Sequence, residues 1–206
     1  MSLLARKTQT AKALPMCNYG NPVLREKSVP VEAVDAAVEE LAERMLVTMA
    51  EQEGIGLAAP QVGQNIRMIT LNVPAPNDTE DSPPFSNTPG ELVLLEQMPI
   101  VLINPQLSVF SEQVYEYNEG CLSMPGIRGC VVRPEFVQLD AATPNGAMVA
   151  FRCGGLLSRC LQHEVDHLDG VLFTEHMKAD DLALLEDVLN KLERQTRLSL
   201  KRRITK

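Results

Sequence analysis

Two histidines and a glutamate stand at a spacing that suits metal-dependent hydrolysis. His163, Glu164 and His167 form an HExxH sequence, and the chain contains only three histidines. Residues four apart on a helix share one face, so both imidazoles would reach one metal ion while Glu164 faces a water molecule. The alternative is a core helix whose histidines only form hydrogen bonds. Burying two imidazoles and a carboxylate without partners is costly, and this favours the metal site.

A catalytic tetrahedral metal site has three protein ligands, whereas HExxH supplies two. Extended zinc-protease patterns place a third histidine six residues after the second, but that position is Phe173 here. His176 lies nine residues after His167 and misses this register. Glu175 and Glu186 are further downstream candidates, but neither has a supporting motif. We therefore expect the third ligand to come from an upstream segment.

The upstream candidate is Cys121, in the turn-like sequence EGCLS (119–123). A cysteine in such a place is either a thiolate ligand or a small buried apolar side chain, and the second is the commoner case. The need for a third donor reverses that order here. A site of one cysteine and two histidines with an open position accommodates Zn or Fe(II), and the ligands alone do not discriminate between them.

Three segments in this order resemble the signature motifs of peptide deformylases: GIGLAAPQ (54–61), EGCLS (119–123) and QHEVDH (162–167). The likeness extends over roughly residues 17–175. A glycine-rich turn such as 54–61 is weak evidence by itself, and it is not a phosphate-binding loop because GxxxxGK[ST] is absent. The presence of all three motifs in this order makes the resemblance specific.

The resemblance implies a role for each matching position. The metal ligands would be Cys121, His163 and His167, and the native metal of the family is Fe(II), often replaced by Ni, Co or Zn. Glu164 would act as general base and then as general acid. The other roles fall on residues of the same motifs and their neighbours: Gln61 and the Leu122 N–H for the oxyanion, Gly56 and Gly120 for backbone hydrogen bonds to the peptide, and Ile55, Leu156 and Cys160 for the methionine pocket.

The implied activity is hydrolysis of the formyl amide of N-formyl-methionyl nascent peptides, with formate and a free N-terminal methionine as products. Two other functions remain open at this point. An HExxH metalloendopeptidase would cleave internal peptide bonds and take its third ligand from downstream. A ribosome-associated binding module would hold a structural metal closed by four protein ligands.

Apolar residues spaced by three and four predict three helices. The first spans Val34–Glu53, and Gly54 follows it as the left-handed C-terminal residue. The second spans Gly155–Asp169 and places both HExxH histidines on its buried face. Its opposite face would carry Arg159, Gln162 and Asp166. The last helix begins near Asp180 and loses its regular structure in the basic sequence KRRITK (201–206).

Segments rich in β-branched residues predict strands at Ile66–Val73, Ile100–Asn104, Val131–Asp140 and Ala147–Cys153. Pro134 gives the third strand an edge-like character. Residues 74–99 hold six of the 14 prolines and are predicted to form a surface insertion between two strands. The predicted fold is α+β, with small antiparallel or mixed sheets packed around a central HExxH helix and with N-terminal and C-terminal helices.

Charge is distributed unevenly along the 206 residues. The net charge is −8, but residues 26–190 carry −18 and residues 191–206 carry +6. An acidic body excludes bulk nucleic-acid binding, DNA included. Residues 191–206 are either a solvated helix end or a contact to ribosomal RNA. No apolar run approaches the roughly 18–20 residues that cross a membrane, so no membrane role is expected.

Composition predicts one globular domain flanked by two short segments. We expect a flexible N-terminus at 1–13, a catalytic domain at 14–193 and a basic tail at 194–206. The basic, acid-free residues 1–13 are either a floppy terminus or part of an organelle-targeting sequence. The five cysteines form no CxxC pair, which predicts reduced thiols and a cytoplasmic protein.

Overall fold

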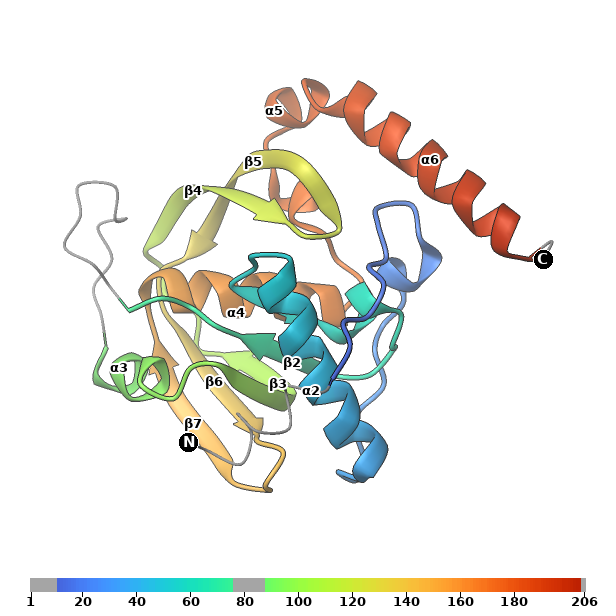
Figure 1. Ribbon diagram of the computed structural model, residues 1–206. Coiled ribbons are helices and arrows are strands. Elements are labelled where there is room, and N and C mark those ends of the chain that lie inside the picture. The colour runs from blue at the N-terminus through green and yellow to red at the C-terminus, as the bar shows by residue number, and fades with distance from the viewer. Residues whose placement is uncertain (1–10, 76–87, 205–206) are drawn as a thin grey trace.

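The computed structural model describes residues 11–75 and 88–204, and Figure 1 shows their arrangement. These residues form two antiparallel sheets. The larger has the strand order β1-β2-β3-β6-β7, with bounds Gly56–Ala58, Met68–Leu71, Ile100–Ser108, Val137–Ala142 and Met148–Cys153. The smaller is a hairpin of β4 (Val114–Cys121) and β5 (Met124–Pro134). The predicted α+β class is confirmed.

Helices lie on both faces of the larger sheet and beyond it. The α-helices are α2 (Ala36–Glu51), α3 (Pro89–Leu95), α4 (Gly155–Leu168), α5 (Ala179–Ala183) and α6 (Glu186–Ile204). Three short 3₁₀ helices are η1 (Pro22–Arg25), η2 (Ala59–Val62) and η3 (Phe173–His176). The HExxH helix α4 runs between the larger sheet and the hairpin, and α2 covers the other face of the sheet (Figure 1).

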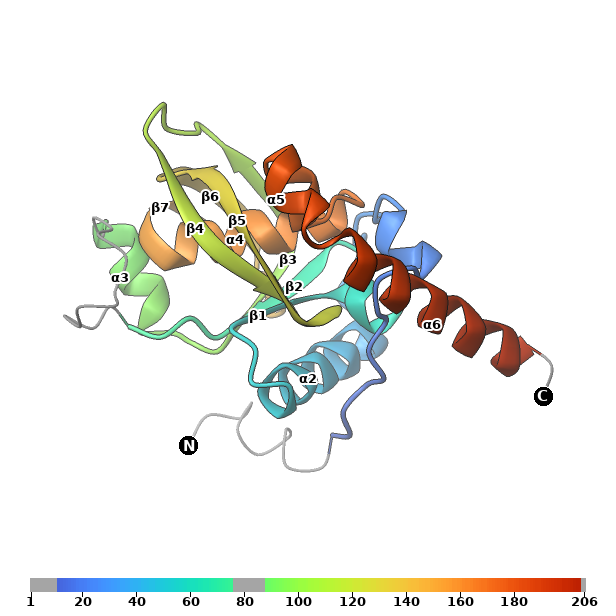
Figure 2. The ribbon, with the colours of Figure 1, turned by 90° about the horizontal axis from the view of Figure 1, so that it is seen from above.

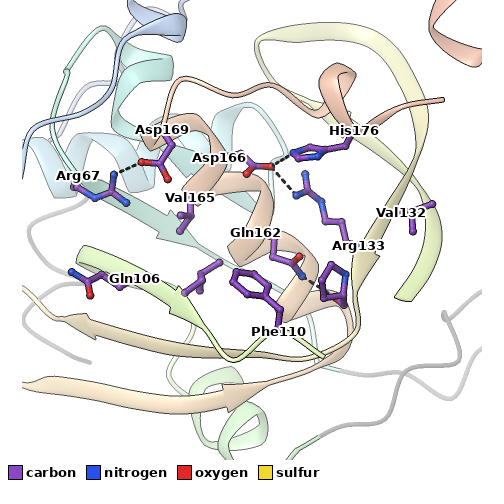
Figure 3. A pocket seen from close by; sticks show the side chains of 12 residues that line it. Arg67, Gln106, Phe110, Val132, Arg133, Gln162, Val165, Asp166, Asp169 and His176 are labelled. Carbon is purple, nitrogen blue, oxygen red and sulfur yellow. Dashed lines mark hydrogen bonds and ion pairs between the residues drawn. The ribbon is translucent and has the colours of Figure 1, made fainter. Parts of the chain in front are cut away.

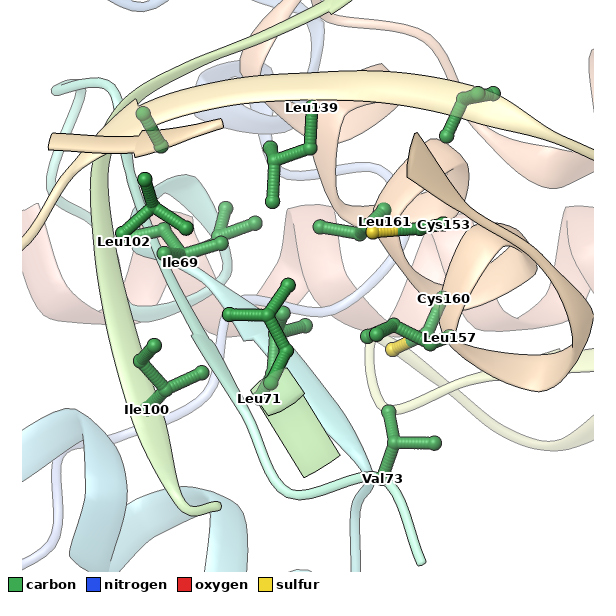
Figure 4. Packing of buried hydrophobic residues seen from close by; sticks show 14 of the residues in the cluster. Ile69, Leu71, Val73, Ile100, Leu102, Leu139, Cys153, Leu157, Cys160 and Leu161 are labelled. Carbon is green, nitrogen blue, oxygen red and sulfur yellow. The ribbon is translucent and has the colours of Figure 1, made fainter. Parts of the chain in front are cut away.

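Alternate residues of the central strands explain why both faces of the larger sheet are covered. Ile69 and Leu71 of β2 point to the α4 side, where they pack with Leu157 and Leu161 (Figure 4). Their neighbour Met68 points to the α2 side. Successive strand residues face opposite sides, so a strand that is apolar at nearly every position needs cover on both. The sheet thus holds α4 in a fixed place.

The helix α4 is buried almost all round, which corrects the predicted solvent face. Arg159 and Gln162 are each 5% exposed, and Asp166 forms an ion pair with Arg133 of β5. The β4–β5 hairpin covers this side of the helix and supplies charged partners for its polar residues. A helical wheel reports the spacing of polar residues, but it does not report a second layer that pairs with them.

The predicted strands differ from the structure most at Val131–Asp140 and at β4. The predicted strand Val131–Asp140 is divided between two sheets, because β5 ends at Pro134 and β6 begins at Val137. The strand β4 was not predicted, and residues 119–121 of the turn-like sequence EGCLS form its end. The exposed side chains of β4 include Glu116 and Asn118, and its buried position is Glu119, so this strand lacks the apolar alternation that sequence patterns detect.

Three further predictions need correction at element ends. The left-handed residue after α2 is Glu53, with a φ of 54°, and Gly54 instead makes room for Leu122. The predicted insertion 74–99 includes α3, whose Leu94 is buried in the main core. The last helix is divided into α5 and α6, and α6 stays helical through Ile204.

The two ends of the chain differ in their contacts. Of the segment 1–13, which was predicted to be flexible, residues 1–10 lie outside the described residues. Within the described part, the Lys12 carbonyl accepts a hydrogen bond from Arg44. The first half of α6 packs on the body through Leu189 and through Glu193, which lies against Gly20, and the last turns of the helix extend beyond the body (Figure 2). In the described part of the chain, no helix is long and apolar enough to cross a membrane. All five cysteines are free thiols.

Candidate metal centre

Three potential ligand side chains meet where the end of β4 approaches α4. Cys121, His163 and His167 each offer one ligand atom, and these atoms lie within 4.8 Å of one another. Cys121 Sγ is 3.3 Å from His167 Nε2, and the centroids of the two imidazole rings are 5.0 Å apart. The structure therefore brings together the HExxH histidines and the upstream cysteine.

The downstream candidates for the third ligand lie elsewhere. His176 Nε2 is 2.9 Å from Asp166 Oδ2. Glu175 forms an ion pair with Arg25, and Glu186 is exposed at the start of α6. Within residues 11–75 and 88–204, none of these side chains joins the cluster of ligand atoms. The structure thus offers no downstream ligand of the kind that the endopeptidase alternative requires.

The chemistry of the cluster fits a metal ion. One thiol and two imidazoles are donors that suit Zn and Fe(II). Burial lowers the pKa of His167 well below its usual value, which keeps the ring in the neutral form that ligates metals. Its Nδ1 is buried and has no hydrogen-bond partner in the part of the chain that the structure describes. The nitrogen that faces Cys121 Sγ is Nε2, so a metal ion would bind there, and Nδ1 would still need a separate partner.

Glu164 is a buried carboxyl group beside the cluster. Its side chain is 4% exposed, and its Oε2 has no hydrogen-bond partner among the described residues. Burial raises the pKa of Glu164 to about 7, so the group both accepts and releases protons near neutral pH. Gly56 permits this position, because a Cβ there would lie 2.7 Å from Cys160 Sγ and closer still to Glu164 Oε1.

Gln61 presents its amide N–H groups to the cluster. The Ala58 backbone N–H donates to Gln61 Oε1 at 2.8 Å, which fixes the orientation of the amide. Gln61 Nε2 then lies 3.4 Å from Cys121 Sγ and 3.3 Å from Ser123 Oγ. The side chain is 1% exposed, so water does not compete for these donors. The short helix η2 therefore carries a fixed donor pointed at the site.

Glu119 contacts the cluster and was not singled out from the sequence. Its Oε2 is 2.9 Å from His163 Nδ1, and it also accepts a hydrogen bond from Arg133 Nη2 at 3.0 Å. Its Oε1 accepts hydrogen bonds from Arg133 Nε at 2.6 Å and from Arg159 Nη1 at 2.7 Å. Every oxygen of this carboxylate is therefore satisfied, although the residue is buried.

The charge state of Glu119 follows from these contacts. Burial by itself raises the pKa of Glu119, but hydrogen bonds from His163 and Arg133 outweigh it and hold the pKa well below its usual range. A carboxylate that accepts a hydrogen bond from the second nitrogen of a ligating histidine fixes the orientation of the ring. Residues i and i+2 share one face of a strand, so a strand assignment at Cys121 would have revealed this neighbour.

A cavity of about 570 Å³ opens over the cluster. It is lined by all but one of the residues to which the family resemblance assigns a role: Ile55, Gly56, Gln61, Gly120, Cys121, Leu122, Leu156, Cys160, His163 and Glu164. The exception is His167, which is 1% exposed and lies behind the cavity wall. Tyr117, Arg128 and Arg159 also line the cavity, and none of them is among the site residues predicted from the sequence.

A second cavity, of about 530 Å³, lies against another face of α4 (Figure 3). Charged side chains line it in pairs. Arg67 Nη1 lies 2.8 Å from Asp169 Oδ1, and Arg133 Nη1 lies 2.7 Å from Asp166 Oδ2. His176 Nε2 also points to Asp166 Oδ2. This rear cavity holds no residue of the ligand cluster.

Comparisons with known proteins identify the family. Residues 13–182 match the Polypeptide deformylase family. The peptide deformylase of Opitutus terrae is 38% identical over 191 residues, which cover 92% of this chain and 97% of that protein. Peptide deformylase 2 of Gloeobacter violaceus is 40% identical over 178 residues, 86% of each chain. This chain belongs to the polypeptide deformylase family.

A solved structure of a plant peptide deformylase 1B agrees with this assignment, with a TM-score of 0.76, 34% identity and coverage of 90% of this chain and 92% of that chain. As a polypeptide deformylase, the protein is a metal-dependent hydrolase that removes the N-formyl group from nascent peptides. The endopeptidase and binding-module alternatives are not favoured.

Proposed function

We propose that Cys121, His163 and His167 bind the metal, and that Glu164 transfers the protons that release formate from formyl-methionyl peptides. The observation that carries this proposal is the state of Glu164. It is a buried carboxyl group with an unpaired oxygen and a pKa of about 7, and it lies in the cavity that the ligand cluster shares. Burial of such a carboxyl group costs folding free energy, and its raised pKa suits it to proton transfer.

We propose Fe(II) as the native metal, with Zn, Ni or Co as replacements. The donors suit all four metals, so the choice rests on the family resemblance. When bound, the metal polarises the formyl carbonyl and lowers the pKa of the attacking water. A Cys121 thiolate beside Fe(II) is sensitive to oxygen. Protein prepared anaerobically in Fe(II) is therefore expected to lose formate-releasing activity in air, whereas the Ni form keeps it.

The proton path runs through Glu164. Its carboxylate accepts a proton from the attacking water, and the resulting acid gives that proton to the leaving amine. A pKa of about 7 suits both steps, because neither proton transfer is then far uphill near neutral pH. The glycine at 56 keeps the space beside Oε1 open, so a small formyl group can enter where a side chain would collide.

Negative charge on the formyl oxygen requires fixed donors. We assign this role to Gln61 Nε2 and the Leu122 backbone N–H. The Gln61 amide is held by Ala58 and points at Cys121, so it needs no reorganisation when charge develops. A donor of this kind contributes about 3–4 kcal/mol to transition-state stabilisation.

The rest of the cavity binds the peptide. Backbone groups at Gly56 and Gly120 are assigned to hydrogen bonds with the extended substrate, because both residues line the cavity without a side chain. Ile55, Leu156 and Cys160 are assigned to the methionine side chain. Burial raises the pKa of the Cys160 thiol, which keeps it neutral and apolar. An uncharged wall suits a thioether.

The test of the proton-transfer role is the substitution Glu164→Gln. Gln has nearly the same shape but cannot carry the proton, so formate release from a formyl-Met peptide should fall by roughly 10²–10⁴-fold while bound metal stays equal to wild type. The matched control is Glu112→Gln, an exposed glutamate outside the cavity. Full activity in Glu164→Gln would overturn the assignment.

We further propose that the enzyme acts in the cytoplasm and approaches the ribosome through residues 191–206. The helix α6 extends away from the body and carries the basic residues Arg194 and Arg202 in exposed positions (Figure 2). Clustered cations on an otherwise acidic chain attract RNA in a salt-dependent way. The double variant Arg194→Gln/Arg202→Gln should weaken ribosome binding at low salt and leave formyl-Met peptide turnover unchanged. Unchanged ribosome affinity would refute the contact.

A further inference from the structure

The helix that carries the proposed active-site residues begins without a cap of its own. Gly154 stands at its N-cap and offers no side chain, and the first turn contains no acidic residue. The first four N–H groups of a helix have no partner within the helix, so another part of the chain must satisfy them. The position of this end of the helix matters, because Leu156 in its first turn and Cys160 in its second turn line the cavity.

Glu91 of α3 supplies the missing acceptor. Its carboxyl group accepts a hydrogen bond from the Gly154 backbone N–H and another from the Thr88 N–H, at 3.2 Å from Oε2. The side chain is 2% exposed, and burial raises the pKa of Glu91 to about 7. An acidic side chain at a helix N-terminus also interacts favourably with the helix dipole. Glu91 therefore caps two helices, its own and α4.

The segment around Glu91 is held firmly against the start of α4. A Cβ at Gly90 would lie 2.9 Å from Phe151 Cδ1 of β7, so the start of α3 is in contact with the last strand before α4. Leu94 is 1% exposed and shares a core cluster with Leu157 and Cys160. Shape and hydrogen bonding thus act together to place α3 on the first turn of α4.

We propose that Glu91 is a positioning residue for the methionine pocket: by capping α4 from outside, it fixes the first two turns of the helix, which carry Leu156 and Cys160. The segment 74–99 then contributes to substrate selection through α3, although none of its described residues, 74–75 and 88–99, lines the cavity. This inference rests on the proposed role of Leu156 and Cys160 in the methionine pocket. Glu91 itself touches neither the substrate cavity nor the ligand cluster.

A positioning role and a purely structural role predict different kinetics. Loss of packing alone lowers the fraction of folded enzyme, which reduces the apparent kcat for every substrate equally. A shifted first turn instead changes the fit of the methionine side chain. It raises KM for a formyl-Met peptide and lowers the preference for formyl-Met over formyl-Ala, while kcat stays nearly constant.

The experiment compares Glu91→Gln with Glu91→Leu. Gln keeps a side-chain oxygen that accepts the Gly154 N–H, whereas Leu fills the same space without an acceptor. Glu96→Gln and Glu96→Leu are matched controls, because Glu96 is exposed at the end of the same helix. The measurements are kcat and KM for the two formyl peptides and amide hydrogen exchange of a fragment covering residues 153–160.

Glu91→Leu is expected to raise KM for formyl-Met peptide about fivefold to tenfold, to reduce the Met-over-Ala preference and to speed exchange in residues 153–160, as expected for a lost cap. Glu91→Gln and both Glu96 variants should stay within twofold of wild type. If Glu91→Leu does not fold, Glu91→Asp takes its place, since it withdraws the carboxyl group by one methylene.

Unchanged KM and exchange in Glu91→Leu, or equal losses in Glu91→Gln, would overturn the inference. Inactivity of the wild-type enzyme towards formyl peptides would instead contradict the proposed function. The exchange measurement would still decide in that case whether Glu91 caps α4.

Discussion

The two cavities against α4 are similar in size but differ in whether the polar side chains around them have hydrogen-bond or ion-pair partners. In the front cavity of about 570 Å³, Glu164 has a buried oxygen without a partner, and the adjoining His167 has a buried ring nitrogen without one. In the rear cavity of about 530 Å³, Arg67 pairs with Asp169 and Arg133 pairs with Asp166. These pairings and missing partners are those within residues 11–75 and 88–204, which the structure describes.

This difference shows where the fold keeps buried polar groups that lack partners. A buried polar group without a partner costs free energy, and folding normally removes such groups. The rear cavity follows that rule. Among the described residues, the front cavity breaks it at Glu164 Oε2, where a transferred proton would supply the missing partner, and at Arg159 Nε. His167 Nδ1 is also unpaired, but a metal ion would bind the other ring nitrogen, Nε2, which faces Cys121 Sγ. The volumes of the two cavities do not indicate which one is the candidate active site, whereas the pairing of their polar groups does.

The largest expected effect compares His167 of the ligand cluster with His176, which lines the rear cavity. His167→Ala removes a proposed metal ligand from the front, and we expect bound metal and formate release to fall to near background. His176→Ala removes a partner of Asp166 at the rear and should keep full metal content and at least half of the activity. Metal analysis and a formate assay on both variants decide the comparison. Equal metal loss in both would show that the rear pairing also supports the centre.

A smaller effect is expected where the two faces are connected, at Glu119. This carboxylate contacts His163 in front and accepts hydrogen bonds from Arg133, which lines the rear cavity. Glu119→Gln should raise the dissociation constant of the metal about 10–100-fold, measured by competition with a chelator on folded protein. The control is Glu116→Gln. Glu116 lies on the same strand as Glu119 but forms an exposed ion pair with Lys178. Wild-type affinity in Glu119→Gln would contradict the role.

A third prediction asks whether burial alone, without loss of hydrogen-bond partners, makes a carboxylate destabilising. Glu91 is as buried as Glu164 but accepts backbone hydrogen bonds, and its pKa is raised to about 7 from 4.5. A raised folded-state pKa means that the stabilisation is complete below about pH 4.5 and is lost as pH rises to about 7. The expected loss is roughly 3 kcal/mol of unfolding free energy.

Urea unfolding between pH 4 and pH 8 measures this loss. Glu91→Gln removes one of two carboxyl groups with a pKa of about 7 and should make the decline less steep, because Glu164 still titrates, while Glu96→Gln should leave it unchanged. An equally steep decline in Glu91→Gln would show that other groups, Glu164 first among them, account for the whole pH dependence.

The smallest effect is expected at the edge of the rear cavity. Asp169 is 41% exposed and pairs with Arg67. Exposed ion pairs contribute about 0–1 kcal/mol, so Asp169→Asn should change the free energy of unfolding by no more than about 1 kcal/mol and leave formate release unchanged. A loss of activity would show that the rear cavity acts on the reaction, and the comparison would then need revision.

Much of the metal centre was predictable from local sequence. The spacing of His163 and His167 determines that they share a helix face, whatever the rest of the fold does. The family resemblance added Cys121 as the third ligand, and the structure brings these three side chains together. Glu119 could not be found in this way, because its partners Arg133 and Arg159 come from other parts of the chain.

The sequence by itself determined the ligand spacing, the HExxH helix and the acidic body with a basic end, since helix periodicity and composition are local properties. Only the tertiary structure decided which polar residues of α4 are buried and paired, where the chain turns left-handed at Glu53, and that α3 caps the start of α4. The physical reason is that burial and hydrogen-bond pairing depend on segments distant in sequence, and no periodicity within one segment records what packs against it.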